Sequence, residues 1–432
     1  MTSDDSILVV GAGFVGLSTA AFLAGGGRRV TVVEKNRLVV DSLNRGKLHF
    51  HEPTLAREIG KVLKSGRLEI TTPSKESYQR SSMIFVAIDS ADQRTRKMKL
   101  AAFDRMAQWI GGVKREKPAV VVLKSTNILG FAELFRVLLD AAPYGASVRL
   151  AVNPEFLREG FAYEDTAKPW RIIVGTQDTP TRTRMVRFFR SVYGSSVPLV
   201  ATDWKSAELI KLSSNLYLAH RLTFINEIAE YARPEGLDID AIRKGIGLDP
   251  RIGQDYFEPG LGFGGSCLPK DCHLINSREV GGEFWFLTAQ IALDVNDRIL
   301  DRVVDGLESQ LGKLKGRKIA LLGAAFKPQT DDTRGSRAVE LAVRLKRLGA
   351  RVSVYEPFLK SAERIVEGNL QLEHNLEAAV SDASAIVIGT AHRRFRSLKP
   401  ESIARLVRKR LVVDRPAALA RRQWEKYGFQ FI

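Results

Sequence analysis

Residues 6–36 read SILVVGAGFVGLSTAAFLAGGGRRVTVVEKN and decide the fold class. An apolar run, a glycine turn, a stretch of small residues and a second apolar run that ends in an acid follow one another. This order of strand, turn, helix and strand is typical of a unit that binds a dinucleotide. We therefore expect the chain to begin with a Rossmann-type domain.

The three glycines of this stretch have distinct expected roles. Gly11 allows the tight turn, Gly13 lets the backbone approach a pyrophosphate, and Gly16 allows contact between helix and sheet. The phosphates bind at the helix N-terminus. Glu34 ends the second strand, where a carboxylate accepts the ribose hydroxyls and repels a 2′-phosphate, so we expect NAD rather than NADP. The cofactor-binding residues predicted here are Gly11, Gly13, Phe14, Val15, Gly16, Glu34 and Lys35.

Further strands are predicted at 81–88, 119–126, 148–155 and 171–175, with helical segments between them. Such alternation predicts a doubly wound parallel sheet. Ligands of these sheets bind at the carboxyl ends of the strands. Ser125, Thr126 and the NPEFLREG turn at 153–160 are therefore expected to face one crevice.

A long helix is predicted within TDWKSAELIKLSSNLYLAHRLTFINEIAEYARPEG, residues 202–236. Thr202 or Asp203 is the expected N-cap, and Pro234 lies near the expected end. Roughly 30 helical residues span about 45 Å, which is longer than one domain normally needs. We expect this helix to join two domains and to pack against a partner subunit.

A second α/β unit is predicted to start at GRKIALLGAAF, residues 316–326. It lacks the glycine fingerprint, so we expect it to bind a nucleotide other than a dinucleotide, or none. The fold class is α/β, with two Rossmann-like doubly wound domains joined by a long central helix and a helical middle region. The predicted domains are 1–200, 201–305 and 306–432.

Composition and charge narrow the function class. The chain has 432 residues, 44% of them hydrophobic and 27% charged, which is typical of a folded protein. It has no apolar run long enough to span a bilayer and no signal-peptide pattern at its start, so we expect a cytoplasmic protein. The net charge of +17 favours either a nucleic-acid surface or an enzyme for anionic substrates. None of the basic runs carries a nucleic-acid motif.

One of only two cysteines lies in GFGGSCLPKD, residues 262–271. Pro269 is typical of a first helical turn, so Cys267 is expected just ahead of a helix N-terminus, where the thiolate form is favoured. The alternative is a buried unreactive cysteine, which is the interpretation we give to Cys272. Asp271 lies about one turn beyond Cys267 and can orient water or a proton carrier. No zinc-ligand spacing is present, so no metal is expected.

Lys211 and Asn215 lie four residues apart on the long helix. Periodicity alone favours a surface lysine that lies along the apolar stripe. If the protein oxidises an alcohol, the ammonium can stabilise an oxyanion and the amide can position it. A nicotinamide site combined with a nucleophilic thiol suggests oxidation of an alcohol beyond the aldehyde, through a thiohemiacetal and a thioester, to a carboxylate.

Several motifs together resemble the UDP-glucose/GDP-mannose dehydrogenase family. They are VVGAGFVGLSTA, NPEFLREG, AELIKLSSNLYLAHRLTFINEIAEYA, RIGQDYFEPGLGFGGSCLPKD and AFKPQTDDTRGSRA, and they span most of the chain. The resemblance implies an N-terminal NAD domain, a central helix that forms a homodimer or higher homo-oligomer, and a C-terminal UDP domain. It also implies that a nucleotide sugar is oxidised twice.

The resemblance assigns roles to individual residues. Cys267 is the implied nucleophile. The implied groups that stabilise the oxyanion and position water are Lys211, Asn215 and Asp271. Glu155 and Thr126 are implied to assist proton transfer and water activation. The implied substrate-binding residues are Phe156, Leu157, Arg158, Glu159, Arg251, Tyr256, Phe263, Gly264 and Lys327, with Arg251 reaching across a dimer interface. Ser125 and Arg334 are implied to contact the cofactor.

The motifs RIG, GGSC and NPEFLREG look most like the branch that oxidises UDP-glucose to UDP-glucuronate. GDP-mannose or a UDP-N-acetylhexosamine is the alternative substrate. Three segments depart from the family pattern: Asp89 and Ser90 replace a Thr-Pro pair, STNILG replaces STVPPG, and KPWR replaces Pro-Asp-Arg. These departures and the charge leave a second class open, namely a nucleotide-sugar or nucleic-acid binder with impaired catalysis.

Overall fold

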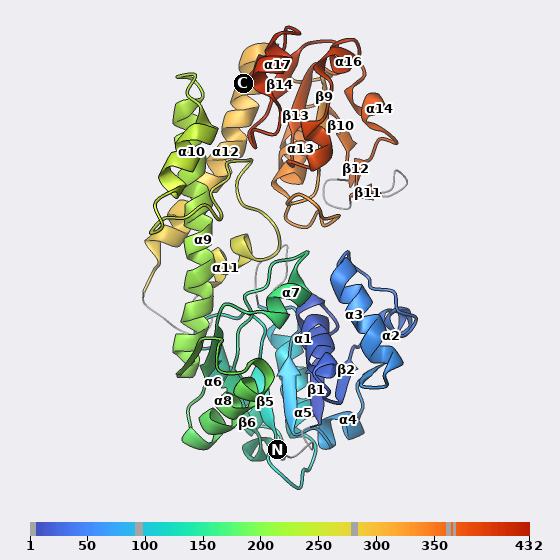
Figure 1. Ribbon diagram of the computed structural model, residues 1–432, viewed down its shortest axis with the longest axis vertical. Helices are drawn as coiled ribbons and strands as arrows, with labels where there is room; N and C mark the ends of the chain where they lie inside the picture. The colour runs from blue at the N-terminus through green and yellow to red at the C-terminus, as the bar shows by residue number, and fades with distance from the viewer. Residues whose placement is uncertain (1–5, 91–97, 278–283, 360–363, 366–368) are drawn as a thin grey trace. The chain divides into compact units, whose positions relative to one another are not determined.

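The structure is a computed structural model and describes residues 6–90, 98–277, 284–359, 364–365 and 369–432. The chain forms two compact units. The first contains residues 1–214 and 273–285, and the second contains 215–272 and 286–432. Figure 1 shows the path of the chain through each of them. The division into domains 1–200, 201–305 and 306–432 stays a prediction.

The first unit is built on an eight-stranded sheet with the order β3-β2-β1-β4-β5-β6-β7-β8. All neighbouring strands are parallel except β6 and β7, which are antiparallel. The strands are β1 (Ile7–Val10), β2 (Val30–Val33), β3 (Leu68–Thr71), β4 (Met83–Val86), β5 (Val120–Leu123), β6 (Arg149–Val152), β7 (Ile172–Gly175) and β8 (Leu199–Thr202).

The reversal at β7 corrects the expectation of a wholly parallel sheet. A parallel neighbour needs a crossover that carries the chain back along the whole sheet, usually on a helix of several turns. Between β6 and β7 the chain has only the turn at 153–160 and the short helix α7 (Ala162–Ala167). The chain therefore re-enters the sheet from the edge at which β6 ended.

The glycine turn fixes helix α1 (Phe14–Gly25) against the sheet. Gly11 has φ of +102°, a left-handed conformation that favours glycine. A Cβ atom on Gly16 would lie 2.0 Å from the carbonyl oxygen of Gly11, so only glycine allows this approach. Leu17 and Ala20 of α1 are fully buried in the core of the unit. The expected strand, turn and helix are thus present at residues 7–25.

Helices cover both faces of this sheet (Figure 1). Residues of α1, α3 and α8 share one hydrophobic core with β1, β2, β4 and β5. Elsewhere in the unit α5 packs against α6, where the Phe103 and Phe131 rings meet with centroids 4.6 Å apart. The helices are α2 (Arg37–Asn44), α3 (Pro53–Lys64), α4 (Lys75–Gln79), α5 (Leu100–Gly111), α6 (Phe131–Asp140) and α8 (Thr179–Tyr193).

The long predicted helix is α9 (Trp204–Ala232). Its N-cap is Asp203, since Oδ1 of this side chain accepts a hydrogen bond of 2.8 Å from the backbone N–H of Ser206. The helix ends two residues before Pro234, as the sequence predicts. Neither α9 nor any other helix in the described part of the chain combines the length and apolar character needed to cross a membrane.

The second unit contains a parallel five-stranded sheet with the order β10-β9-β13-β14-β15. The strands are β9 (Lys318–Leu322), β10 (Arg351–Tyr355), β13 (Ala385–Ile388), β14 (Leu411–Val413) and β15 (Gln430–Phe431), and β11 (Arg364–Ile365) pairs with β12 (Leu370–Gln371) beside them. This confirms a second α/β domain with Rossmann-like strand pairing.

Two helical layers cover this sheet. On one face α12 (Leu287–Leu311) and α13 (Arg337–Arg347) share a core with Ile319 and Leu321 of β9. On the other, four short helices share a core with the alternate residues Ala320 and Leu322. These helices are α14 (Leu376–Val380), α15 (Arg393–Arg396), α16 (Pro400–Ala404) and α17 (Arg421–Glu425). The unit also contains α10 (Ile239–Gly247) and most of α11 (Leu268–Leu274).

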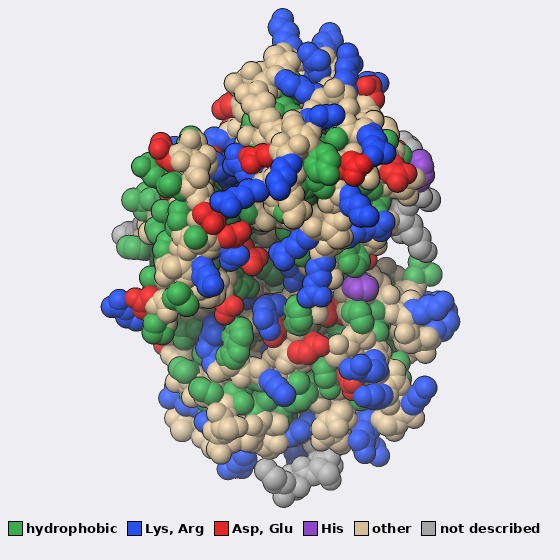
Figure 2. Space-filling view, turned by 45° about the horizontal axis from the view of Figure 1, so that its top comes forward, with side chains coloured by type: hydrophobic (Ala, Val, Ile, Leu, Met, Phe, Trp, Pro, Cys, Tyr) green, Lys and Arg blue, Asp and Glu red, His purple; other side chains and the backbone are tan. Residues whose placement is uncertain are grey.

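Much of the positive charge of the chain lies on this last layer. Residues 393–432 contain 12 Lys and Arg against 3 Asp and Glu, so this segment supplies 9 of the 17 net positive charges. Every one of these basic side chains except Arg415 is exposed. Figure 2 shows that Lys and Arg outnumber Asp and Glu on the visible face of the protein. The charge excess is therefore concentrated at the C-terminal end of the chain.

Candidate active site

The glycine turn of the first unit has the features that a dinucleotide requires. A Cβ atom on Gly13 would meet nothing within 4 Å, so the space in front of the turn is open. No side chain caps the N-terminus of α1, which leaves its backbone N–H groups directed outward. Glu34 is half-buried after β2, and its Oε2 accepts only a long hydrogen bond of 3.3 Å from Ala12 N–H. Phe14 and Val15 are half-buried and Lys35 is exposed around this space. These residues fit NAD.

The ends of β4 and β5 are bonded to each other. Ser125 Oγ donates a hydrogen bond of 2.6 Å to the carbonyl oxygen of Ile88. Ser90 Oγ donates to the carbonyl oxygen of Thr126, and Asp89 pairs with Lys99 at 2.5 Å. Ser90 thus supports the Thr126 backbone although it departs from the family pattern. Residues 91–97, which follow Asp89 and Ser90 and include the basic sequence RTRK at 94–97, lie outside the described residues.

The turn after β6 holds the predicted substrate residues through side-chain contacts. Arg158 forms a 2.7 Å ion pair with Asp165. The guanidinium of Arg171 lies 3.8 Å from the centroid of the Phe156 ring, a cation–π contact. Leu157 N–H donates 2.6 Å to Oε2 of Glu155, which fixes that carboxylate. Leu157 and Glu159 are half-buried in the same turn.

Lys211 and Glu155 form a buried ion pair. Nζ of Lys211 lies 3.3 Å from Oε1 of Glu155, and the two side chains are only 4% and 8% exposed. The interpretation of Lys211 as a surface lysine, which periodicity favoured, is therefore wrong. Burial strengthens the interaction because less water screens it. The pair places an ammonium and a carboxylate at the carboxyl ends of the strands, in keeping with the role that the family resemblance implies.

Sequence reasoning missed two polar residues beside this pair, the half-buried Lys124 and the buried Asn153. Lys124 follows β5 directly, and its Nζ donates a hydrogen bond of 2.9 Å to Oδ1 of Asn153. Asn153 follows β6 and donates 2.8 Å from Nδ2 to the carbonyl oxygen of Ile173 in β7. The signal was present in the sequence, since a lysine after the apolar run AVVVL is unusual for a buried strand.

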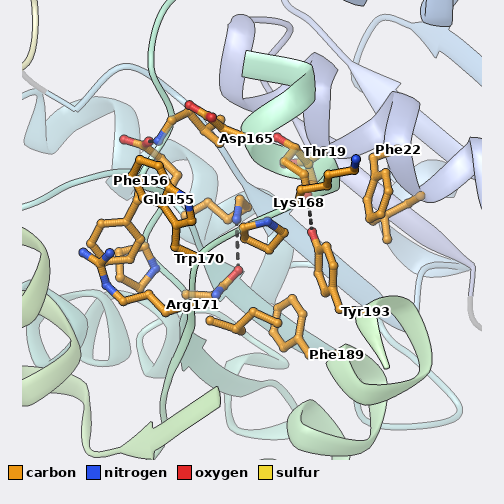
Figure 3. A pocket seen from close by; sticks show the side chains of 18 of the residues that line it. Thr19, Phe22, Glu155, Phe156, Asp165, Lys168, Trp170, Arg171, Phe189 and Tyr193 are labelled. Carbon is orange, nitrogen blue, oxygen red and sulfur yellow. Dashed lines mark hydrogen bonds between the residues drawn. The ribbon is translucent and has the colours of Figure 1, made fainter. Parts of the chain in front are cut away.

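Both residues line a cavity of about 70 Å³ behind the substrate turn (Figure 3). Phe22, Phe189 and Tyr193 form one side of it, and Glu155 and Phe156 form the other. A volume of this size has room for roughly five water molecules.

Glu208 of α9 is another buried acid. Unlike Glu155, it was not identified by the sequence analysis. Its carboxylate accepts hydrogen bonds of 2.7 and 2.8 Å from the backbone N–H groups of Gly130 and Ala132 at the start of α6. Burial raises the pKa of Glu208 to about 8, and the backbone hydrogen bonds oppose that shift. Glu208 therefore attaches α9 to the segment that follows Thr126.

In the second unit, Cys267 directly precedes α11, as expected. Its carbonyl oxygen accepts a hydrogen bond of 2.8 Å from Asp271 N–H, and its Sγ lies 3.6 Å from Ser266 Oγ. Asp271 is buried, accepts 2.5 Å from Nδ2 of Asn215, and lies 3.0 Å from Nζ of Lys270. The thiol therefore has a carboxylate one helical turn away whose position the amide of α9 fixes.

The glycine loop before Cys267 packs against protein. A Cβ atom on Gly264 would lie 2.5 Å from the carbonyl oxygen of Gly335, and one on Gly265 would lie 2.7 Å from the Phe326 ring. Gly265 N–H also donates 3.0 Å to the carbonyl oxygen of Gly335. The space beside these two glycines is filled by residues 326 and 335 of the same unit.

Phe263 is held from both sides of its backbone. Its N–H donates 2.7 Å to Oδ1 of Asn296, and its carbonyl oxygen accepts 3.0 Å from Nδ2 of the same amide. Arg337, also buried, donates 2.6 Å to the carbonyl oxygen of Asn296 and 3.3 Å to that of Leu261. These contacts tie the loop before Cys267 to α12 and α13.

The remaining predicted residues lie elsewhere in the second unit. Arg251 is 88% exposed and pairs with Asp249 at 2.6 Å. Tyr256 has a positive φ of 55°. Lys327 lies 5.6 Å from the Phe326 ring centroid, and Arg334 pairs with Asp332 at 2.5 Å. Thus Thr126, Glu155 and Lys211 belong to the first unit, whereas Asn215, Cys267, Asp271 and these residues belong to the second.

An open dinucleotide turn and a cysteine placed before a helix define a class of protein, the NAD-dependent dehydrogenases that carry a nucleophilic thiol. Three family models match the chain. They are the NAD binding domain (residues 5–193), the central domain (205–298) and the UDP binding domain (320–421) of one family. The chain belongs to the UDP-glucose/GDP-mannose dehydrogenase family. It is an NAD-dependent oxidoreductase that acts on a nucleotide sugar.

Individual relatives agree with this assignment. The chain is 33% identical over 98% of both chains to a UDP-glucose 6-dehydrogenase of Rhizobium meliloti. It is 35% identical to one of Bacillus subtilis, covering 89% of this chain and 87% of the relative. The structure of a UDP-glucose dehydrogenase from Pyrobaculum islandicum matches with a TM-score of 0.86 and 34% identity over 96% of both chains.

The fold is shared with enzymes for other sugars. The structure of a UDP-D-ManNAc dehydrogenase from Pyrococcus horikoshii matches with a TM-score of 0.85, over 99% of this chain and 98% of that one, at 26% identity. The fold therefore does not separate the sugars, and the higher identities fall on proteins named for UDP-glucose.

Proposed function

We propose that this protein oxidises UDP-glucose to UDP-glucuronate in two successive steps. The observation that carries the proposal is the position of Cys267 directly before α11, with the buried Asp271 one turn away and bonded to Asn215. The identities of 33 and 35% to two UDP-glucose 6-dehydrogenases support the choice of sugar.

In the first step the C6 alcohol loses its hydroxyl proton and a hydride. NAD, if bound at the turn of residues 11–16, would accept this hydride, and a second NAD that replaces the departed NADH would accept the hydride of the second step. Lys211 stabilises the negative oxygen, and Glu155, which lies 3.3 Å from Lys211, accepts the proton directly or through water. The products are the aldehyde, NADH and one proton.

In the second step the Cys267 thiolate adds to the aldehyde carbon and forms a thiohemiacetal. Loss of a hydride from that carbon gives a thioester. Asn215 and Asp271 position water, whose oxygen attacks the thioester carbon. The C–S bond breaks to return the thiolate, and the two protons of the water pass to solvent. The sum is two hydrides transferred and one carboxylate formed for each sugar.

We propose ligand contacts within each unit on the basis of the family resemblance. We propose that Phe156, Leu157, Arg158 and Glu159 of the first unit hold the sugar. Phe263, Gly264, Tyr256 and Lys327 of the second unit are proposed to hold the sugar nucleotide. Ser125 and Arg334 complete the cofactor contacts. The fixed backbone of Phe263 supports such a role, because a binding group that is held in place loses less entropy when the ligand binds.

We further propose a homodimer built on α9. Tyr217, Phe224 and Tyr231 are spaced by seven residues along α9 and are 60, 48 and 69% exposed. Large exposed side chains in a row on one helix indicate an interface. Arg251, which is 88% exposed, is the residue we expect to reach the partner's site. A cytoplasmic location stays a prediction.

The test of the proposed function is the number of NADH formed per UDP-glucose consumed. We expect two NADH for the purified protein. Cys267→Ser should abolish turnover to the acid, because the thioester can no longer form. Cys272→Ser is the matched control, since Cys272 is fully buried and should not affect the stoichiometry. Activity with GDP-mannose or a UDP-N-acetylhexosamine alone would overturn the choice of sugar, and binding without turnover would favour the impaired binder.

The dimer is tested separately by light scattering coupled to size-exclusion chromatography. Tyr217→Glu with Tyr231→Glu should convert the dimer into a monomer, because two charges would enter the apolar row. Lys346→Glu, at an exposed position on α13, is the control and should leave the mass unchanged. A wild-type monomer at micromolar concentration would contradict the proposal.

A further inference from the structure

The five-stranded sheet of the second unit has two edges of different character. Its strands are all parallel, so they start at one edge and end at the other (Figure 1). Ligands of such sheets bind beyond the carboxyl ends of the strands. We call the opposite side the strand-start edge. It consists of the five segments that lead into the strands, which are residues 312–317, 346–350, 381–384, 405–410 and 426–429.

The strand-start edge is strongly basic. Its five segments contain 10 Lys and Arg and a single acid, Asp382. At the other edge the charge is balanced, with 3 Lys and Arg against 4 Asp and Glu in the segments that follow β9, β10, β13 and β14. These segments are residues 323–335, 356–359, 389–392 and 414–417. Charge that only keeps a protein soluble has no reason to favour one edge of a sheet.

The basic segments form one continuous surface. Backbone hydrogen bonds of 2.7 to 2.9 Å join each segment or strand start to its neighbour. The pairs of donor N–H and acceptor carbonyl are Gly316–Gly349, Ser384–Lys318, Arg408–Ala383 and Gln430–Arg410. Neighbouring strands lie about 4.8 Å apart, so five strands make an edge about 19 Å wide. Of its ten basic side chains, all except Arg317 are exposed.

A nucleotide at the carboxyl ends of the strands does not account for this charge. Strand β9 has five residues and therefore separates the two edges by about 16 Å. Salt at physiological concentration screens exposed charges over about 8 Å. The strand-start edge is thus electrostatically separate from a ligand at the other edge, and its charge fits a different anionic partner.

Two large apolar side chains narrow the class of that partner. Leu348 and Tyr427 lie in the same segments and are 42 and 41% exposed. Cations at headgroup level combined with aliphatic and aromatic side chains are typical of a surface that binds a bilayer. A DNA duplex is instead recognised by a helix or a ribbon that enters a groove. The strand-start edge presents loops and the ends of helices, which favours the bilayer.

We propose that the strand-start edge of the second unit is a docking surface for an anionic phospholipid bilayer. Each Lys or Arg near such a surface increases binding about fivefold. Leu348 and Tyr427 enter the boundary between headgroups and acyl chains. The binding is peripheral and weakens with salt, because the charges lie at the surface of the protein. The inference goes beyond the oxidation proposed above and does not depend on it.

The experiment is co-sedimentation of the full-length protein with vesicles. We expect binding to phosphatidylcholine vesicles that contain about 30% phosphatidylglycerol and no binding to pure phosphatidylcholine. The variant Lys313→Gln, Arg408→Gln, Lys426→Gln removes three exposed charges from three segments of the edge. Its binding to the anionic vesicles should be about 100-fold weaker.

The matched control removes three exposed charges from the first unit. It is the variant Lys47→Gln, Lys64→Gln, Arg67→Gln, which has the same net charge as the first variant and should bind the vesicles like the wild type. A second variant, Leu348→Ser with Tyr427→Ser, keeps every charge and should bind about tenfold more weakly, because less apolar area is buried. Circular dichroism verifies that each variant is folded.

Three results would overturn the inference. The first is absence of binding to anionic vesicles. The second is equal weakening in the two charge variants, which would mean a general effect of net charge. The third is tighter binding to a short DNA duplex than to the vesicles at the same salt concentration, unaffected by the two serine changes, which would make the edge a nucleic-acid surface.

The test also separates this inference from the proposed function. NADH formation with UDP-glucose by the Lys313, Arg408 and Lys426 variant should equal that of the wild type, since these side chains lie at the edge opposite the expected ligand. Vesicle binding should in turn persist in Cys267→Ser. Either proposal can therefore fail while the other stands.

Discussion

The two α/β domains begin with nearly the same turn and use it differently. Residues 11–14 read GAGF and residues 323–326 read GAAF. Gly11 and Gly323 both have positive φ, 102 and 90°, and the N–H of each donates to the last residue of the neighbouring second strand, at 2.9 and 2.8 Å. An acid follows that strand in both cases, Glu34 after β2 and Glu356 after β10. The local geometry is thus repeated.

The difference lies in what the acid already binds. Glu34 accepts 3.3 Å from Ala12 N–H and 2.9 Å from Asn36 N–H and is half-buried. Glu356 is only 2% exposed, and its Oε2 accepts 2.7 and 3.0 Å from the N–H groups of residues 324 and 325 and lies 3.1 Å from His392 Nε2. The Glu34 carboxylate can still accept hydrogen bonds from ribose hydroxyls. The Glu356 carboxylate is already bonded to groups of its own domain. A shared turn therefore does not imply a shared ligand.

The largest effect is expected for Glu356→Ala. The change leaves several buried N–H groups without an acceptor, so the free energy of unfolding of the second unit should fall by about 3–5 kcal/mol. Glu34→Ala, the matched change in the first domain, should cost no more than about 0.5 kcal/mol. Urea unfolding followed by circular dichroism measures both. Equal losses would contradict the distinction between the two acids.

The next effect is expected for Gly16→Ala. Its Cβ would clash at 2.0 Å with the carbonyl oxygen of Gly11, so α1 must move away from the sheet. We expect a loss of about 1–3 kcal/mol in unfolding free energy, as for overpacking in a core, together with loss of NAD binding. Gly13→Ala is the control for the fold. Its Cβ has open space, so only NAD binding should weaken. Calorimetric titration with NAD beside urea unfolding distinguishes the two variants.

A smaller effect is expected for the affinity of Glu34→Ala for NAD. Loss of the hydrogen bonds to two ribose hydroxyls should raise the Kd for NAD about tenfold, at about 1.4 kcal/mol. The preference over NADP should fall at the same time, because the repulsion of a 2′-phosphate disappears. Tryptophan fluorescence titration with each dinucleotide measures this. An unchanged preference would show that another group selects the cofactor.

The smallest effect is expected for Ala325→Gly, which converts the second turn to the sequence of the first. Glycine gives the unfolded chain more freedom, so stability should fall by about 0.4–1 kcal/mol. Combined with Gly16→Ala, which removes NAD binding at the first turn, Ala325→Gly should show no NAD binding by calorimetric titration. NAD binding by this variant would show that Ala325, and not Glu356, prevents the second turn from binding NAD.

Local features could be predicted from the sequence because their causes are local. The turn at Gly11, the N-cap at Asp203 and the position of Cys267 before α11 each depend on residues within one or two turns of chain. The reversal of β7 was not predicted, because a short α7 looks like a helical crossover when its length is judged from sequence. The sequence correctly predicted a strand at 171–175 next to a helical segment. It did not predict that this strand runs antiparallel to β6.

Contacts between distant segments could not be predicted in the same way. Lys124 meets Asn153 only because β5 and β6 are neighbours in the sheet, and Glu208 meets the start of α6 across 76 to 78 residues of chain. Lys211 was interpreted as a surface residue because helical periodicity does not reveal which partner covers a polar position. Its burial depends on Glu155, which lies 56 residues earlier. The roles of the site residues remain proposals that the experiments above decide.

The placement of the two cysteines has a consequence for the handling of the protein. Neither forms a disulfide, Cys267 is partly exposed and Cys272 is fully buried. In the native state a thiol reagent should therefore titrate one group, and a second should react only after unfolding. An oxidant that converts Cys267 to a sulfenic acid would find no accessible thiol in the chain to form a protective disulfide. Oxidative damage would then proceed to irreversible forms, so the protein depends on an external reductant to keep its thiol.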